Sequence, residues 1–227
     1  MSLIIDNLTT LLQHFRESEI AFHRPPGSVQ LLAVSKNQPV EAIQQAIEAG
    51  QLAFGENYLQ EALPKIAALS YPGLEWHFVG RLQTNKAQKI AAHFNWVHTV
   101  ENIHIAQRLN KYRPKKLGPL NICLQVNTSH ELTKAGAHFD EVLSLAKTCL
   151  TLPNLRLRGL MALPRPYIHF IDQRAEFYKL NLVNKILIEH GIILDTLSMG
   201  TSADWKAAIA EGSTLVRIGR AMFNNFF

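Results

Sequence analysis

Cysteine is scarce in this sequence, which has only Cys123 and Cys149 among its 227 residues. Two cysteines cannot build the framework of a small disulfide-rich secreted domain or a four-cysteine zinc site. Cys123 lies in an apolar, strand-like run, and Cys149 lies near the end of a helical one. We therefore expect both to be small core residues rather than a disulfide or metal pair.

Long apolar runs are also missing, since none approaches the roughly 18 residues that a membrane-spanning helix needs. The first twenty residues carry charged side chains such as Asp6, Arg16 and Glu17, where a signal peptide would be uninterruptedly apolar. These absences predict a cytoplasmic protein that does not bind membranes.

Charge of one sign is not dominant, because 23 basic residues face 18 acidic ones and the net charge is +5. The clearest basic cluster covers residues 111–116, with Tyr112 as its one aromatic residue. We expect a solvated helix end there and no nucleic-acid binding, since no recognised motif accompanies it. The histidines His93, His98 and His104 lack the spacing of a zinc site, so no metal is expected.

Apolar strand-like runs alternate with helical patterns along the chain, without an internal repeat or a domain linker. The patterns predict strands at residues 31–36, 52–57, 74–80, 96–100, 120–126, 155–161, 193–198 and 214–218. They predict helices at residues 2–20, 39–49, 58–68, 84–92, 103–112, 139–150, 173–190 and 204–211, and a last short helix near the C-terminus.

This alternation predicts an α/β fold with a parallel sheet. Eight units favour a single (β/α)₈ TIM barrel, one domain over residues 1–227, with the extra N-terminal helix outside the barrel or across one end. The alternative is an open doubly wound sheet. Its nucleotide-binding form would need a glycine-rich turn after the first strand, where this chain has Lys36-Asn37-Gln38-Pro39.

A lysine ends the first predicted strand, whose sequence is Leu31-Leu32-Ala33-Val34-Ser35-Lys36. Apolar walls around Lys36 would favour the neutral amine, which is a nucleophile and forms Schiff bases with aldehydes. The alternative is that Lys36 is simply the first solvated residue after a strand.

Small and polar residues follow the last two predicted strands, where TIM barrels often hold phosphate. The first segment is Ser198-Met199-Gly200-Thr201-Ser202, and the second is Arg217-Ile218-Gly219-Arg220-Ala221. The amides of Gly219 and Arg220 would lie at a helix start, which is an anion site. An amine at strand one and a phosphate cradle at strands seven and eight are what pyridoxal 5'-phosphate (PLP) requires. Ordinary loop and capping chemistry is the alternative for Gly200, Ser202 and Gly219.

Several strings, in order along nearly the whole chain, resemble the pyridoxal phosphate homeostasis proteins (the YggS/PROSC family). They are Val34-Ser35-Lys36, Phe54-Gly55-Glu56-Asn57-Tyr58, Trp76-His77-Phe78-Val79-Gly80, Leu82-Gln83-Thr84-Asn85-Lys86, Arg158-Gly159-Leu160-Met161, Leu197-Ser198-Met199-Gly200 and Val216-Arg217-Ile218-Gly219. The resemblance implies a PLP barrel like the N-terminal domain of alanine racemase, without the second domain of that enzyme.

The resemblance also implies a set of cofactor-binding residues. Lys36 would carry PLP as a covalent aldimine, and Arg217 would face the pyridine nitrogen. Ser202, Gly219 and the amide of Arg220 would hold the phosphate. Asn57 and His77 would be polar residues of the pocket, with Ser198 and Met199 on its wall. The chain departs from the family pattern at Thr201, where methionine is frequent, and at Arg220, where a hydroxyl residue is frequent.

The function that the resemblance implies is PLP carriage in intracellular vitamin B6 homeostasis, with little or no catalysis and no catalytic residues. PLP-dependent apoenzymes are candidate recipients. The alternative is a PLP-dependent amino-acid racemase. An arginine at the pyridine nitrogen weakens the electron sink, because a guanidinium only donates hydrogen bonds. A racemase of this fold also needs a second acid/base on the opposite face of the ring.

Overall fold

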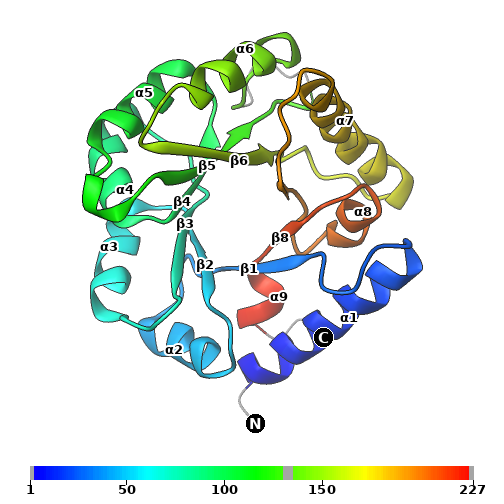
Figure 1. The fold of residues 1–227 in the computed structure, drawn as a ribbon. Coiled ribbons are helices and arrows are strands. Elements are labelled where there is room, and N and C mark those ends of the chain that lie inside the picture. Colours follow the sequence, from blue (N-terminus) through cyan, green and yellow to red (C-terminus); the bar gives the residue numbers. More distant parts are fainter. Residues whose placement is uncertain (1–2, 130–134, 225–227) are drawn as a thin grey trace.

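The computed structural model describes residues 3–129 and 135–224 and forms a closed barrel of parallel strands in the order β1 to β8 (Figure 1). The strands are β1 (Gln30–Val34), β2 (Ala53–Glu56), β3 (Glu75–Phe78), β4 (Trp96–Val100), β5 (Leu120–Gln125), β6 (Leu155–Met161), β7 (Thr196–Ser198) and β8 (Leu215–Ile218). The predicted barrel is confirmed. The alternative prediction of an open sheet is wrong, because β1 pairs with β8 and closes the barrel.

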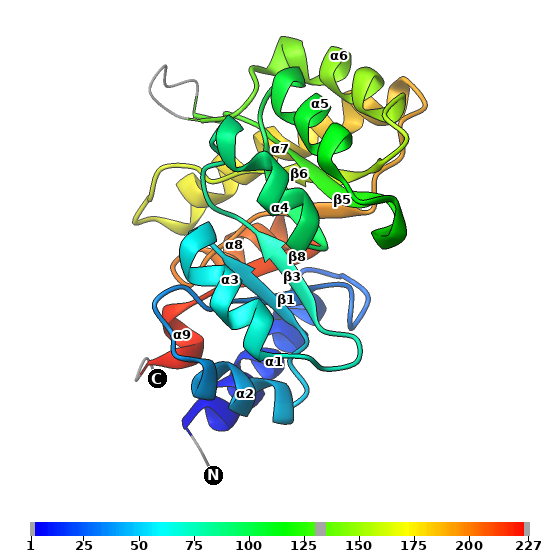
Figure 2. The ribbon, with the colours of Figure 1, turned by 90° about the vertical axis from the view of Figure 1, so that its left-hand side faces the viewer.

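Helices surround the barrel and follow the strands in alternation (Figures 1 and 2). They are α1 (Leu3–Ala21), α2 (Val40–Glu48), α3 (Leu59–Ala68), α4 (Ala87–His93), α5 (Ile103–Tyr112), α6 (Phe139–Leu150), α7 (Phe170–Glu189), α8 (Trp205–Ala210) and α9 (Arg220–Phe223), with short 3₁₀ turns at Thr84–Lys86 and Lys115–Leu117. None of the helices among these described residues is long and apolar enough to cross a membrane.

The N-terminal helix α1 lies outside the barrel, beside α9 (Figure 1). Helix α9 spans only four residues, so it leaves much of the outer face of β8 and β1 uncovered. Helix α1 covers this face with a stripe that includes Leu11 and Phe15, both fully buried. Asn7 fastens the arrangement, because its Nδ2 donates to the carbonyl oxygens of Met222 and Asn224, both at 3.0 Å.

Only β4 and β6 have the predicted boundaries, and two of the differences at the other strands have a clear cause. Strand β1 ends at Val34 rather than at Lys36, because the chain turns at Asn37, whose φ is 60°. Strand β7 begins at Thr196 rather than at residue 193, since its pairing with β6 starts at Thr196 opposite Gly159. Ile193, predicted to lie in this strand, is 84% exposed.

The barrel interior is partly polar. His98 on β4 contacts Ser198 on β7, and because these strands are not neighbours the contact crosses the interior. Trp96 lies two residues before His98 and therefore shares its face of β4. It packs in a small cluster with Cys123 and Met161, separate from the large apolar core. Cys149 belongs to that large core. Both cysteines are free and buried, as predicted.

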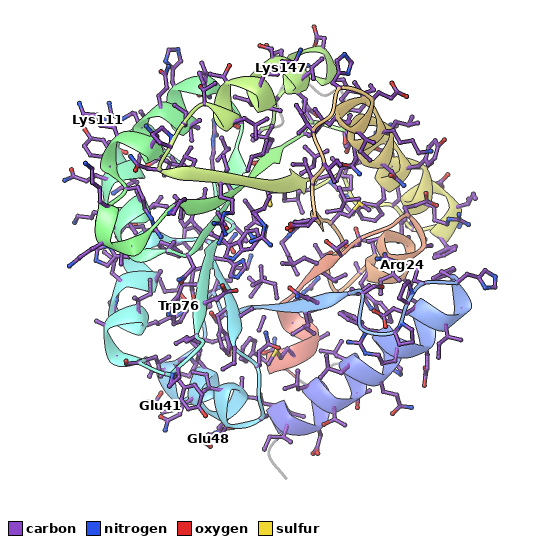
Figure 3. All side chains as sticks on the ribbon, viewed as in Figure 1. Arg24, Glu41, Glu48, Trp76, Lys111 and Lys147 are labelled. Atoms are coloured by element: carbon purple, nitrogen blue, oxygen red, sulfur yellow. The ribbon has the colours of Figure 1, made fainter. Side chains whose placement is uncertain are left out.

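The basic cluster at residues 111–116 is less exposed than predicted. Arg113 is buried, and its guanidinium donates to the carbonyl oxygens of Ala91, Phe94, Leu117 and Gly118. It joins the end of α5 to the neighbouring loops, so it is a structural residue. Lys111 points outward from α5, as Lys147 does from α6 (Figure 3).

A buried carboxylate, Glu19, ties the end of α1 to the loop before β1. It accepts hydrogen bonds from the backbone N–H groups of Gly27 at 2.8 Å and Val29 at 2.7 Å, and from Arg16. Burial alone would raise the pKa of Glu19, but these hydrogen bonds outweigh burial and lower the pKa below its ordinary value.

This lowered pKa makes stability depend on pH. The folded state binds the proton of Glu19 less readily than the unfolded state, so the stabilisation is present above the unfolded pKa and is lost as pH falls through the folded one. We expect Glu19→Gln to lower the free energy of unfolding by about 1–3 kcal/mol at pH 7, and by less at pH 3. Urea unfolding at both values measures the difference. An equal loss at both would contradict this role for the charge.

Candidate functional site

A pocket of about 210 Å³ opens at the C-terminal ends of the strands. Its walls come from the ends of β1, β2, β3, β6, β7 and β8, which is where the fold concentrates functional side chains. The lining residues are Val34, Lys36, Asn57, Val79, Met161, Leu163, Thr201, Ser202, Arg217, Gly219 and Arg220. The structure thus brings together most of the residues that the sequence singled out, although they lie up to 184 positions apart (220 − 36).

Lys36 lies at the mouth of this pocket and is exposed. The expectation that apolar walls surround its ammonium group is wrong, because Lys36 follows β1 by two residues and lies in the turn. No described residue forms a hydrogen bond or an ion pair with its Nζ, so the amine is accessible to a ligand in the pocket.

The backbone on both sides of Lys36 is held by a buried ionic network. Lys65 on α3 is 5% exposed, and its Nζ donates to the carbonyl oxygen of Ser35 at 2.7 Å. The same Nζ contacts Glu56 at 2.8 Å and Glu61 at 2.6 Å. Glu61 in turn accepts a hydrogen bond from the N–H of Asn37. The network therefore fixes the two residues that flank Lys36.

Glu56 carries the other half of this network. Its Oε1 accepts hydrogen bonds from Lys65 and from the hydroxyl of Ser35 at 2.7 Å, whereas its Oε2 is buried without a partner among the described residues. Burial raises the pKa of Glu56, and Lys65 and Ser35 oppose this shift. Lys65 is therefore the cation that compensates the negative charge of the buried Glu56 carboxylate.

Arg217 forms the floor of the pocket and is 6% exposed. Its Nη1 donates to the carbonyl oxygen and the hydroxyl of Ser198 at 2.6 and 2.8 Å, and its Nη2 donates to the carbonyl oxygen of Ala162 at 2.9 Å. No carboxylate of the described residues pairs with it. Burial lowers the pKa of Arg217 to about 10, so the group remains a cation at neutral pH.

Burying a cation without a carboxylate partner costs free energy, and an anionic ligand in the pocket would offset that cost. An arginine at a strand end could instead pair with a carboxylate, but the side-chain partners of Arg217 among the described residues are Ser198 and Ala162. These hydrogen bonds leave N–H groups of Arg217 that no described residue uses, on Nε and on Nη2.

Asn57 lines the pocket next to a close approach between two backbones. The Oδ1 of Asn57 is buried and has no partner among the described residues. A Cβ atom at Gly80 would lie 1.9 Å from the carbonyl oxygen of Asn57, so only glycine fits at position 80. The tight approach holds Asn57 against the pocket while its side-chain oxygen stays available.

The turn between β7 and α8 contributes Ser202. Thr201 is engaged locally, because its N–H and its hydroxyl both contact Asp204 Oδ1, at 2.6 and 2.9 Å. The Ser202 hydroxyl has no partner among the described residues. Gly219 and Arg220 follow the neighbouring strand β8 and lie at the start of α9, where the first N–H groups of a helix have no acceptor within it.

His77, Ser198 and Met199 lie beneath the pocket and do not line it. His77 is 2% exposed, and Ser198 and Met199 are fully buried. His77 Nδ1 lies 2.9 Å from His98 Nε2, and His98 Nδ1 lies 2.8 Å from the Ser198 hydroxyl. The three predicted residues thus stand outside the cavity, and two of them connect to Arg217 through side chains.

Sequence reasoning missed Lys65, Glu56 and His98. Glu61 and Lys65 are four residues apart on a helix, which in a sequence reads as an exposed ion pair. Nothing in the sequence reports that Ser35 and Glu56 bury this pair from the side. Among residues 3–129 and 135–224 no group of His, Cys, Asp and Glu is placed to hold a metal ion.

Comparison with known proteins agrees with the fold and with the motifs. Residues 9–225 match the model of the alanine racemase N-terminal domain. The pyridoxal phosphate homeostasis protein of Pseudomonas aeruginosa is 50% identical over 223 residues, which is 98% of this chain and 96% of that protein. The Escherichia coli protein of the same name is 45% identical over 226 residues, covering 98% of this chain and 97% of its own length.

Among solved structures, PipY of Synechococcus elongatus with PLP bound superposes with a TM-score of 0.84 at 36% identity, over 97% of this chain and 100% of that one. Alanine racemase of Clostridium difficile superposes with a TM-score of 0.73 at 12% identity, over 95% of this chain and 59% of that one. The second likeness shows the fold alone. Sequence, motifs and fold lead to one conclusion: this chain belongs to the family of pyridoxal phosphate homeostasis proteins.

Proposed function

We propose that this protein binds PLP in the pocket between Lys36 and Arg217 and acts as a PLP carrier in vitamin B6 homeostasis. The observation that carries the proposal is that one pocket combines an accessible amine with a buried, uncompensated guanidinium. The names of the relatives, and the PLP bound to PipY, support the same ligand.

The residues present fit PLP in chemistry as well as in place. Arg217 supplies a cation and free N–H donors on the pocket floor, and Ser202 supplies an unpaired hydroxyl beside Gly219 and Arg220. The unpartnered Oδ1 of Asn57 supplies an acceptor. In this assignment Ser202 and the Gly219–Arg220 amides bind the phosphate, and Arg217 donates to the ring nitrogen. His77, Ser198 and Met199 stay predictions as direct cofactor contacts.

When bound, PLP supplies an aldehyde, with which a lysine amine condenses to an imine as one water is released. Lys36 is the lysine that lines the pocket, and the Lys65 network holds the turn from which it projects. We therefore assign the covalent linkage to the Nζ of Lys36. Arg220 is exposed at the rim, where its side chain adds positive charge near the phosphate.

We further propose that catalysis is weak or absent. Arg217 is a donor without a carboxylate partner, so it would leave the ring nitrogen unprotonated and the ring a poor electron sink. The alternative, an amino-acid racemase, is tested by incubating the PLP-loaded protein with a panel of L-amino acids and separating the enantiomers. We expect no exchange above that of free PLP. Rapid racemisation of any one amino acid would favour the enzyme.

The phosphate assignment gives a test with a matched ligand pair. Loss of a hydrogen bond to a charged group costs about 1.5–3 kcal/mol, so Ser202→Ala should weaken PLP binding by roughly 10- to 100-fold. Pyridoxal lacks the phosphate and should bind both proteins alike. Absorbance titrations measure both ligands. Equal losses for PLP and pyridoxal would place the phosphate elsewhere.

Two features of the proposed function concern the cell. PLP-dependent apoenzymes are the candidate recipients, because they need the cofactor that this protein would carry. Transfer is measured by mixing the PLP-loaded protein with such an apoenzyme and following its activity. A cytoplasmic location remains a prediction from the sequence.

A further inference from the structure

A row of polar side chains connects the pocket floor with the opposite end of the barrel. It begins at Arg217 on β8, continues through Ser198 on β7 and His98 on β4, and reaches His77 on β3. Beyond His77 stands Glu75, the first residue of β3, whose Oε2 lies 3.6 Å from His77 Nε2. Four strands thus contribute to one line of side chains within the barrel.

The two histidines are enclosed. His98 is fully buried and His77 is 2% exposed, and the ring of Trp96 stacks on His77 with centroids 5.2 Å apart. Burial lowers the pKa of His77 and takes that of His98 well below its ordinary range; for His98, repulsion from His77 when that ring is protonated and from the cation of Arg217 adds to the effect. The charged groups that face the pair are Glu75, Arg217 and Arg158. Both rings are therefore neutral near pH 7, with one proton each.

The carboxylate of Glu75 decides where those protons are. Its Oε2 lies 3.6 Å from His77 Nε2, too far for a hydrogen bond, and Nε2 has no hydrogen-bond partner among the described residues. The negative charge still favours a proton on the facing Nε2 over a lone pair there, so Nδ1 of His77 is the acceptor. His98 must then donate from Nε2 to that Nδ1, which leaves its own Nδ1 to accept from the Ser198 hydroxyl. With its hydrogen directed at His98, the Ser198 oxygen presents only lone pairs to Arg217.

All hydrogen-bond donations consequently run in one direction, from Arg217 to His77, and the charge of Glu75 lies beyond the last ring. We propose that Glu75, His77, His98 and Ser198 are positioning residues that hold Arg217 as a fixed hydrogen-bond donor for the ring nitrogen of the cofactor. The proposal rests on the PLP function proposed above. It extends the site beyond the pocket, since Glu75 lies at the N-terminal end of its strand and the pocket lies at the C-terminal ends.

The row explains why the interior carries histidines in place of apolar residues. A barrel interior of valine and leucine would bury Arg217 with backbone carbonyls alone as partners. The Ser198 oxygen adds a second acceptor to Nη1, and the histidines prevent the hydroxyl hydrogen from turning toward the guanidinium. The distant carboxylate of Glu75 sets the direction of these hydrogen bonds, although it does not contact Arg217.

The first test uses the protein without cofactor and reads the histidine tautomers by ¹⁵N NMR. We expect both His77 and His98 to be neutral and protonated at Nε2 at pH 7. In Glu75→Leu, which removes the carboxylate, we expect a population of His77 protonated at Nδ1, whereas Glu75→Gln, which keeps an oxygen but loses the charge, should show a smaller one. Glu48→Leu is the matched control, since Glu48 is exposed on the outer side of α2 (Figure 3). A wild-type His98 protonated at Nδ1 would overturn the proposal.

The second test adds PLP labelled with ¹⁵N at the ring nitrogen. We expect Ser198→Ala and Glu75→Leu to move the ring-nitrogen resonance away from its wild-type position, and Glu48→Leu to leave it in place. Ser198→Ala should also weaken PLP binding about tenfold, because Nη1 loses one acceptor. Unchanged ring-nitrogen shifts in both variants would overturn the coupling. Failure of the wild type to bind PLP would instead contradict the proposed function and leave the tautomer result standing.

Discussion

Replacing Lys36 by alanine should abolish covalent attachment of PLP. After mixing with PLP and reduction with borohydride, the wild type should carry the cofactor on the peptide that contains residue 36, and Lys36→Ala should carry none. The physical reason is that the described pocket presents this one lysine amine to the ligand. Peptide mass analysis after reduction measures the result.

The matched control is Lys89→Ala, because Lys89 is exposed on α4 and does not line the pocket. It should keep the full adduct. Since the side chain of Lys36 has no hydrogen bond or ion pair with a described residue, Lys36→Ala should unfold at the same denaturant concentration as the wild type. A variant that retains the adduct at another single lysine would show that the linkage is assigned to the wrong residue.

Replacing Lys65 by methionine should cause the largest loss of stability among the substitutions considered. The change keeps the side-chain bulk but leaves Glu56 buried without its cation, and its Oε2 already lacks a partner. Breaking a buried ion pair by removing one member costs about 3–5 kcal/mol. Denaturant unfolding at pH 7 measures the free energy of unfolding.

The same substitution on the surface provides the reference. Lys89→Met should change the free energy of unfolding by less than about 0.5 kcal/mol. The double variant Lys65→Met/Glu56→Gln should lose less than Lys65→Met alone, because the uncompensated charge is gone. A loss below about 1 kcal/mol for Lys65→Met would mean that the network contributes little to the fold. If the fold survives, a slower rate of adduct formation would show that the network also positions Lys36.

The fold was readable from the sequence because it depends on local periodicity. Helices such as α5 and α6 and strands such as β4 and β6 begin and end at the predicted residues. The residues at strand ends were predictable for a related reason, since parallel strands direct their C-terminal ends to one face. That rule alone brings Lys36 and Arg217 into one pocket.

The interior of the site was not readable, because it depends on side chains that meet across the barrel. His98 and Ser198 are 100 positions apart in the sequence, and Lys65 and Ser35 are 30 positions apart. A sequence shows that His77 and His98 lie in strands, but a strand presents its residues alternately to the two faces, and either face is compatible with a histidine. The exposed position of Lys36 agrees with the alternative of a solvated residue after a strand, because the strand ends two residues before it.

The fastening of α1 by Asn7 has a consequence for biosynthesis. Met222, whose carbonyl oxygen accepts from Asn7, lies 215 positions later in the chain. Strand β1 likewise cannot pair with β8 until β8 has been synthesised. At a synthesis rate of about 5–20 residues per second, roughly 10–40 s separate the appearance of α1 from that of its partner. During this interval the apolar stripe around Leu11 and Phe15 lacks its native contacts with α8 and α9, although α2 is already present. The nascent chain therefore cannot complete the packing of its first helix until β8 and α9 have been synthesised.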